Sequence, residues 1–171
     1  IGSHSQPMPD HLKMAILKLC NSAQDNIKTL AETDHKLGKL YSATSLELMD
    51  MLNLDASQIA AIGCHGQTVR HVAPGQENIP FSLQIGDANI LAADTGVPVV
   101  SDFRRKDMAL GGQGAPLAPA FHRQIFANKD KSRVIVNIGG IANITYLSKE
   151  GDCLGFDTGP GNMLMDLWSQ T

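Results

Sequence analysis

A short apolar run at residues 59–64 (IAAIGC) constrains the possible folds of this chain most, because it ends in small residues and passes directly into the polar segment HGQT. A run of this length and character is typical of a buried parallel strand. A second run, Val97–Ser101, has the same character, and its Pro98 favours an edge strand or a first strand position. Together with the helical segments around them, these strands indicate an α/β fold.

Amphipathic segments precede the first of these strands. The apolar spacing predicts a helix over residues 10–25, with Asp10 as its N-cap. Residues 29–52 follow the helical period with charges between the apolar positions, so they predict a longer helix or two in tandem.

Glycine and proline divide the next part of the chain. Residues 81–85 alternate like a strand, after which Gly86-Asp87 begins a short helix that Gly96 ends. The polar, charged and glycine-rich residues 102–115 predict a long loop. Two prolines then suit the first turn of a helix over residues 116–127.

A polar break at residues 128–131 is expected to be a domain boundary. Beyond it, two apolar strands joined by Gly139-Gly140 have the pattern of a β-hairpin. The expected elements are strands at 133–138, 141–147 and 154–156, a turn at 157–162 and a helix beginning at 163–168.

The composition limits the classes of protein that need to be considered. Apolar residues make up 43% and the formal net charge is −3, which fits a soluble globular protein and gives no basic surface for nucleic acid or an anionic membrane. The three cysteines do not have the spacing of zinc ligands, so a reduced, cytoplasmic chain is expected. There is no secretory signal pattern and no apolar stretch near the ~20 residues needed to span a bilayer.

Two segments of the second part could carry chemistry. Glycines at Gly139-Gly140 let backbone N–H groups approach an anion, although this turn taken alone favours an ordinary hairpin. Asp157 lies where a strand gives way to a helix, in DTGPGN. Ligands gather beyond the carboxyl ends of strands in open α/β sheets, and helix N-termini attract phosphate. Asp157 is therefore a candidate base, and the alternative is a helix cap.

Polar residues also follow the two parallel strands of the first part. Asp102 precedes Arg104 and Arg105, which could bind a carboxylate or phosphate through two hydrogen bonds, whereas the alternative is a solvated charged loop. His65 and Gln67 follow the other strand, and a lone histidine is more often structural than catalytic. No serine–histidine–aspartate spacing, zinc-protease motif or Walker phosphate loop is present.

In their order and spacing, these segments resemble the anhydro-N-acetylmuramic acid kinase family over essentially the whole chain. The matching runs are IGCHGQTV (62–69), LQIGD (83–87), DFRR with Asp107 (102–107), ALGGQGAPL (109–117), NIGGIAN (137–143) and FDTGPGNMLMD (156–166). The resemblance implies a ribonuclease-H-like, actin-like ATPase fold of the hexokinase–Hsp70–actin class. Residues 1–130 would be most of the first ribonuclease-H-like half and residues 131–171 the beginning of the second, with a nucleotide in the cleft between the halves.

The resemblance also implies an activity. The family uses ATP, Mg²⁺ and water to convert 1,6-anhydro-N-acetylmuramic acid into N-acetylmuramic acid 6-phosphate in cell-wall recycling, and a homodimer is expected. Asp157 would be the general base. Nucleotide contacts would come from Gly139, Gly140, Asn143, Gly159 and Gly161, and sugar contacts from Arg104, Arg105, His65, Gln67 and Asp102. No protein ligand for a metal is expected.

The chain departs from the family pattern at both ends. Family members begin with a glycine- and serine-rich phosphate hairpin and continue through an adenosine-binding region, and neither is found between Ile1 and Thr171. The 171-residue chain is therefore expected to be inactive alone or part of something longer. The alternatives are a non-catalytic module that binds a sugar or muropeptide, and another carbohydrate kinase of the same fold class.

Overall fold

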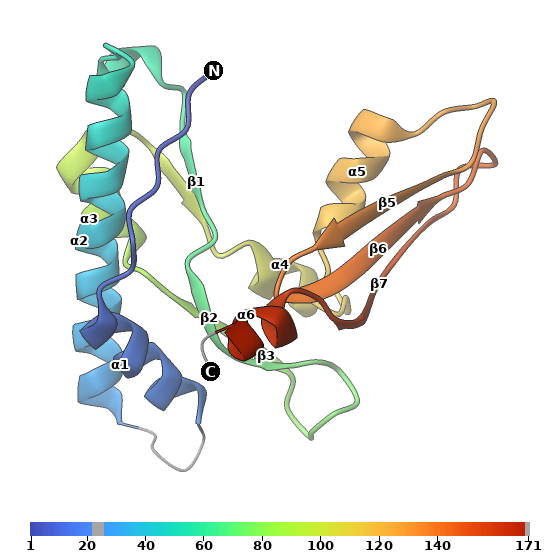
Figure 1. Cartoon of the computed structure of the whole chain (residues 1–171), viewed down its shortest axis with the longest axis horizontal. Coiled ribbons are helices and arrows are strands. Elements are labelled where there is room, and N and C mark those ends of the chain that lie inside the picture. Colours follow the sequence, from blue (N-terminus) through green and yellow to red (C-terminus); the bar gives the residue numbers. More distant parts are fainter. Residues whose placement is uncertain (22–25, 170–171) are drawn as a thin grey trace. The chain divides into compact units, whose positions relative to one another are not determined.

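The computed structural model describes residues 1–21 and 26–169. The chain forms a mixed α/β structure (Figure 1) that divides into two compact units, residues 1–114 and 115–171. Each unit is described by itself. The boundary expected near residue 130 concerns the two halves of the expected ribonuclease-H-like fold, and it stays a prediction.

The first unit opens with two packed helices, α1 (Asp10–Cys20) and α2 (Ile27–Met51), which lie side by side (Figure 1). The side chain of Asn26 caps α2, because its Oδ1 accepts from the backbone N–H groups of Lys28 and Thr29. The prediction that Asp10 is an N-cap is wrong: Pro9 occupies that position and Asp10 is the first helical residue, where its charge suits the helix dipole. The end of the first expected helix, residues 22–25, lies outside the described residues.

The two apolar runs of this unit each form a strand, as expected, and the structure pairs them in parallel. β1 (Ile62–Cys64) pairs with β4 (Val99–Ser101), so that Cys64 lies opposite Ser101 at the carboxyl ends of both strands. Both strands are shorter than the apolar runs, and the expectation of burial is wrong: Gly63 and Val100 are exposed. A short 3₁₀ turn, Ala56–Gln58, precedes β1.

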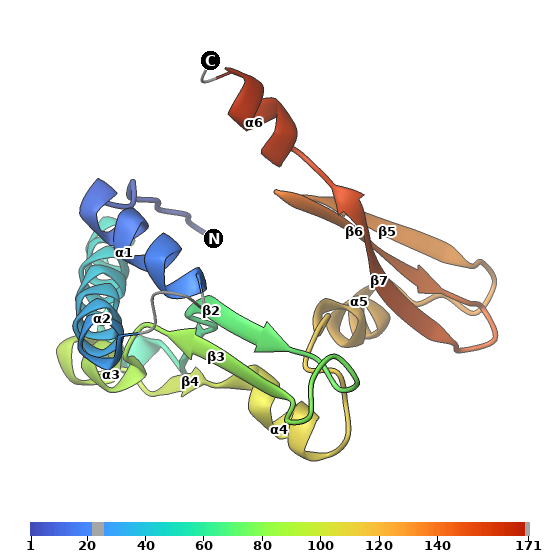
Figure 2. The same ribbon diagram turned by 90° about the horizontal axis from the view of Figure 1, so that it is seen from below.

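A second, antiparallel pair packs beside the helices and extends away from them (Figure 2). It consists of β2 (Gln67–Val72) and the expected strand β3 (Phe81–Ile85). β2 was not predicted from the sequence. Helix α3 (Ala88–Thr95) follows β3, and Gly96 ends it in the left-handed conformation, as expected. The region 102–115 is not wholly a loop, because α4 (Phe103–Ala109) occupies its first half.

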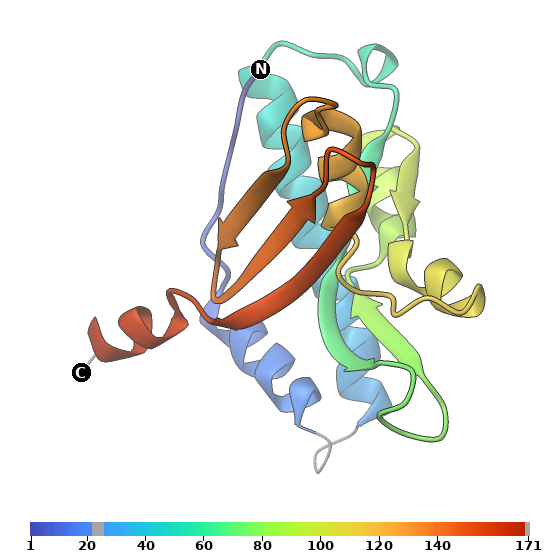
Figure 3. The same ribbon diagram turned by 90° about the vertical axis from the view of Figure 1, so that its right-hand side faces the viewer.

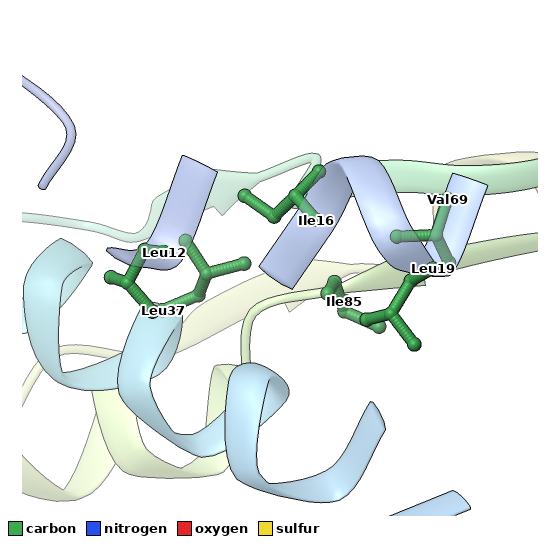
Figure 4. Close-up of a cluster of buried hydrophobic side chains, with 6 residues drawn as sticks. All are labelled: Leu12, Ile16, Leu19, Leu37, Val69 and Ile85. Atoms are coloured by element: carbon green, nitrogen blue, oxygen red, sulfur yellow. The ribbon is translucent and has the colours of Figure 1, made fainter. Parts of the chain in front are cut away.

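The core of the first unit joins α1 and α2 to the antiparallel pair. Figure 4 shows the apolar side chains that meet there: Leu12, Ile16, Leu19, Leu37, Val69 and Ile85. Burial of each of these side chains removes ~1.5–3 kcal/mol of unfavourable apolar hydration. This cluster fixes β3, and therefore the Gly86-Asp87 turn that follows it, against α2.

The second unit is a three-stranded antiparallel sheet with one helix, α5 (Ala118–Phe126), against a single face. The strands run in the order β5 (Arg133–Ile138), β6 (Ile141–Leu147) and β7 (Cys153–Pro160), coloured orange to red in Figure 3. His122 of α5 hydrogen-bonds Thr145 of β6 at 2.9 Å. The expected hairpin is confirmed, and α6 (Met163–Ser169) begins where a helix was expected.

The segment after Phe156 is not a turn, because β7 continues through Asp157 to Pro160. Its pairing with β6 holds these residues extended despite their glycine and proline. Asp157 therefore lies within a strand, three residues before its end, rather than in a loop beyond it.

Candidate functional site

A polar cavity of ≈ 290 Å³ opens at the carboxyl ends of β1 and β4. The strand ends supply Cys64, His65, Ser101 and Asp102 to its wall, and Arg105 of α4 completes that side. The opposite wall is the turn between β3 and α3, with Asp34 of α2 behind it. The sequence predicted three of these residues as sugar contacts, His65, Asp102 and Arg105, and they lie around one space.

Asp102 and Arg105 form an ion pair within the cavity wall. The Asp102 Oδ2 atom accepts from Arg105 Nε at 2.7 Å and lies 2.6 Å from its Nη2. The hydrogen bond from Arg105 holds the pKa of the Asp102 carboxyl below its ordinary value, so the carboxylate is charged near neutral pH. Asp102 also has a left-handed backbone (φ 58°, ψ 49°), a conformation that costs ~1–3 kcal/mol outside glycine and gathers at functional sites.

The second arginine has different partners. Arg104 Nε donates to His65 Nε2 at 2.8 Å, and Arg104 Nη1 donates to the Gly114 carbonyl at 2.7 Å. Because a guanidinium can only donate, His65 Nε2 carries a lone pair, and the proton is on Nδ1, 2.8 Å from the Gly66 carbonyl. Neither Arg104 nor Gln67 lines the cavity; the Gln67 amide donates to the Thr68 carbonyl at 3.0 Å.

The Gly86-Asp87 turn is held by α2 from behind. Asp34 Oδ1 accepts from the Gly86 N–H at 2.7 Å, and the Asp34 carbonyl accepts from the Asp87 N–H at 3.2 Å. Gly38 lies so close that a Cβ there would come within 2.9 Å of the Asp87 carbonyl oxygen. The sequence reasoning missed Asp34, since a carboxylate in an amphipathic helix gives no signal, whereas LQIGD was visible as a motif.

The cavity also contains a thiol. Cys64, the last residue of β1, is half-buried, and burial raises the pKa of its thiol. The group is therefore protonated and neutral near physiological pH, and it acts as a small apolar part of the wall rather than as a nucleophile.

In the second unit, Asp157 lies in a row of polar residues across the sheet. It is opposite Asn143 of β6, which is in turn opposite Asn137 of β5. Residues directly opposite on antiparallel strands have Cβ atoms ~4.5–5.5 Å apart and point to the same face. Asn137 was quoted only as part of a motif, and the strand register is what reveals it as a neighbour of the other two.

A bulge sets the direction of Asp157. Ala142 pairs with Gly159 and Asn143 with Asp157, so Thr158 is the extra residue, and its hydroxyl donates to the Ala142 carbonyl at 3.1 Å. Bulges re-aim neighbouring side chains and are enriched beside active sites. The Asp157 side chain is exposed, so its carboxylate is open to solvent or a ligand.

The Gly139-Gly140 turn is closed by the segment after β7. The N–H of Gly161 donates to the Gly140 carbonyl and the N–H of Asn162 to the Gly139 carbonyl, both at 2.8 Å. A Cβ at position 161 would come within 2.1 Å of the Gly139 oxygen, so only glycine permits this approach. All five predicted nucleotide contacts therefore lie around one end of the same sheet: Gly139, Gly140, Asn143, Gly159 and Gly161.

Within 1–21 and 26–169, no three histidine, cysteine, aspartate or glutamate side chains gather into a group that could bind a metal ion. In the same ranges, no helix combines the length and the apolar character needed to cross a membrane.

Comparison with known proteins identifies the family. The family model described as anhydro-N-acetylmuramic acid kinase matches residues 1–171. The chain belongs to this family. A curated protein of that name from Aliivibrio fischeri is 53% identical over 168 residues, which are 98% of this chain and 45% of that protein. The Shewanella denitrificans protein of the same name is 54% identical over 169 residues, 98% of this chain and 45% of that protein.

The resemblance seen in the motifs is therefore confirmed. The chain spans about half the length of the curated anhydro-N-acetylmuramic acid kinases that it matches, including 46% of the Vibrio vulnificus YJ016 protein. Both groups of candidate residues lie within the matched region.

Proposed function

We propose that this chain is part of an ATP-dependent kinase that opens 1,6-anhydro-N-acetylmuramic acid with water and phosphorylates O6. The product is N-acetylmuramic acid 6-phosphate, formed during bacterial cell-wall recycling. One observation supports this assignment above others: in a chain of this family, an exposed carboxylate and a closed glycine turn lie at one end of the same sheet.

The architecture in this proposal is an actin-like ATPase of the hexokinase–Hsp70–actin class. Residues 1–130 correspond to most of its first ribonuclease-H-like half and residues 131–171 to the beginning of the second. An antiparallel three-stranded sheet that leads into a helix, as in β5, β6, β7 and α6, fits the opening of such a half. The kinase is a cytoplasmic homodimer.

Asp157 is the general base of the reaction. Its carboxylate takes a proton from a water molecule, and the water oxygen forms a bond to the anomeric carbon C1 of the sugar. The bond between C1 and O6 breaks, and the electron pair stays on O6. O6 then bonds to the γ-phosphorus of ATP, whose bond to the bridging oxygen breaks and releases ADP. Asn143 and Asn137, in register beside Asp157, offer amide groups that can orient the carboxylate.

The glycine turn holds the transferred phosphoryl group. Gly139 and Gly140 carry no Cβ, so phosphate oxygens can approach their backbone, and the hydrogen bonds from residues 161 and 162 keep the turn in place before ATP binds. Gly159, with a φ of 141°, and Asn143 border the same end of the sheet. Prearranged backbone dipoles stabilise the charge that spreads over the phosphoryl oxygens in the transition state.

The polar cavity of the first unit holds the sugar. Arg105 bears the positive charge there and can bind the carboxylate of the lactyl group, while Asp102 and His65 offer partners for hydroxyl groups. Arg104 and Gln67 are further candidates from the sequence. Magnesium bound with ATP would neutralise phosphate charge in this chemistry. The described residues contain no group of histidine, cysteine, aspartate or glutamate side chains that would fit it as a set of ligands.

A turnover assay tests this function in a protein of full family length that carries this sequence. With ATP labelled at the γ-phosphate, and H₂¹⁸O as solvent, the product should carry the label on O6 and one ¹⁸O derived from solvent. A phosphorylated product that still contains the anhydro bridge would disprove the hydrolytic step. Sugar binding with no phosphoryl transfer would instead favour the non-catalytic sugar-binding module.

A further inference from the structure

Arg104 links three segments of the first unit. It lies in the first turn of α4, and its two hydrogen bonds reach His65 after β1 and Gly114 at the end of the glycine-rich loop 110–114. Its side chain is half-buried, whereas the Arg105 side chain is 69% exposed and lines the polar cavity. Adjacent arginines on one helix thus have different surroundings.

The glycine that Arg104 contacts is buried, so both of its backbone polar groups need partners. Arg104 satisfies the carbonyl at 2.7 Å, and Asp107 Oδ2 accepts from the N–H at 2.8 Å. Gly114 has a φ of 72°, and a Cβ there would come within 2.7 Å of Met108 Cγ. Side chains of α4 therefore hold this peptide from both sides, in a conformation that only glycine adopts at low cost.

The other end of the link has a defined chemical state. His65 accepts from Arg104 through Nε2 and directs its Nδ1 proton to the Gly66 carbonyl, so the ring is neutral and its two nitrogens are both engaged. His65 itself lines the cavity. Through this ring, the position of a cavity residue depends on the same guanidinium that holds the loop.

We propose that Arg104 is a positioning residue that couples the glycine-rich loop 110–114 to His65, and that it makes no contact with the sugar. Its guanidinium fixes the loop and the imidazole as one rigid assembly, while Arg105 alone distinguishes an anionic sugar from a neutral one. These separate roles of the two arginines rest on the proposed sugar site of the first unit. They refine the sequence-based expectation that both arginines contact the sugar.

The first experiment measures amide hydrogen exchange in loop 110–114, in a protein of full family length that carries this sequence. Arg104→Lys cannot supply the paired donors of a guanidinium, so exchange at Gly114 should quicken by ~10-fold, as expected for loss of a charge-assisted hydrogen bond. His65→Leu removes the acceptor of the other Arg104 hydrogen bond and should also quicken exchange in the loop. His65→Gln places an oxygen near the Nε2 position, so loop exchange should stay close to that of the parent. Arg105→Lys is the matched control and should leave loop exchange unchanged.

The second experiment separates positioning from recognition. The kcat/KM ratio between 1,6-anhydro-N-acetylmuramic acid and the uncharged 1,6-anhydro-N-acetylglucosamine should fall in Arg105→Gln, which removes the positive charge. In Arg104→Lys that ratio should stay as in the parent while both kcat/KM values fall together. If Arg104→Lys lowers the ratio and leaves loop exchange unchanged, the proposal is wrong. If the parent phosphorylates neither sugar, the proposed function fails, and the exchange data still decide whether Arg104 holds the loop.

Discussion

The position of each candidate site residue is set by the neighbouring residues that it contacts. The bulge at Thr158 and the pairing of Asp157 with Asn143 give the Asp157 carboxylate a defined place on the sheet. The Asp102 carboxylate is similarly defined by Arg105, and Arg104 by His65 and Gly114. Each of these relations depends on contacts between residues that come from different elements or turns, and each predicts a measurable effect.

Replacing Asp157 with asparagine should abolish most turnover in a protein of full family length. Asparagine keeps the size and one oxygen of the side chain, but it cannot accept a proton at neutral pH. Loss of a general base costs ~10²–10⁴-fold in rate. Turnover, calorimetric binding of sugar and ATP, and a thermal melt should be measured on the same variant, with binding and melting expected near parent values.

The matched control for this substitution is Asp152→Asn, an exposed aspartate in the turn before β7. Its turnover should equal that of the parent. If Asp157→Asn retains turnover within a few-fold of the parent, Asp157 is not the base.

The Asp102 carboxyl should titrate below its ordinary value of 3.8, because Arg105 stabilises the charged form. For a carboxyl whose folded-state pKa is depressed, the pairing stabilises the folded chain above the unfolded-state pKa, and this contribution is lost as the pH falls through the folded-state pKa. Arg105→Gln should move the Asp102 pKa back up toward 3.8. Carboxyl chemical shifts in an NMR titration measure both values; an Asp102 pKa that does not change in the variant would show that the ion pair is absent in solution.

At the scale of elements, the sequence predicted best where local chemistry decides the structure. Gly96 ends α3 and Gly139-Gly140 joins two strands because only a few backbone conformations suit those positions. Prediction from the sequence failed where strand pairing or helix formation overrides the local conformational preference of the residues. Strand β2 contains Arg70 and His71 and has weak alternation, yet β3 completes its hydrogen bonds. Helix α4 was missed because charges and the glycines that follow it imitate a loop.

The candidate site residues also divide into those that local sequence predicts and those that it does not. Asp157, the glycine turn, and the group of His65, Asp102 and Arg105 were visible because each follows an apolar run. Asp34 and Asn137 were not, since their roles depend on which element lies beside them. The neutral state of His65 and the separate surroundings of the two arginines also depend on contacts that form only in the folded chain.

The cap of α3 gives a prediction at this scale. Asp87 Oδ1 accepts from the N–H of Asn89 at 2.8 Å and from the N–H of Ile90 at 3.4 Å. Asp87→Ala should destabilise the start of the helix by ~1 kcal/mol, whereas Asp87→Ser retains a cap and should lie near the parent. Amide exchange at residues 89 and 90 measures the effect. Equal exchange in the alanine and serine variants would contradict the cap.

At the scale of the whole 171-residue polypeptide, apolar surface stays exposed on both units. In the described part of the first unit, β1 pairs with β4 alone. In the second unit, α5 packs against one face of the sheet, the face of Thr145. The opposite face carries Val134, Val136, Ile138, Tyr146, Leu154 and Phe156, all more than a third exposed. Contiguous apolar surface of this kind and an unpaired strand edge favour association between chains.

The isolated polypeptide should therefore self-associate as its concentration rises, and a charge on the open sheet face should suppress this. Val136 is 58% exposed and lies in the middle of β5, so Val136→Lys places an ammonium where a second chain would have to bury it. Gln124→Lys adds the same charge on an exposed position of α5 and is the control. Sedimentation velocity and binding of an apolar dye should show less association for Val136→Lys than for Gln124→Lys. If the parent chain sediments as a monomer with a sharp cooperative melt, or if both lysine variants behave alike, the open face does not drive association.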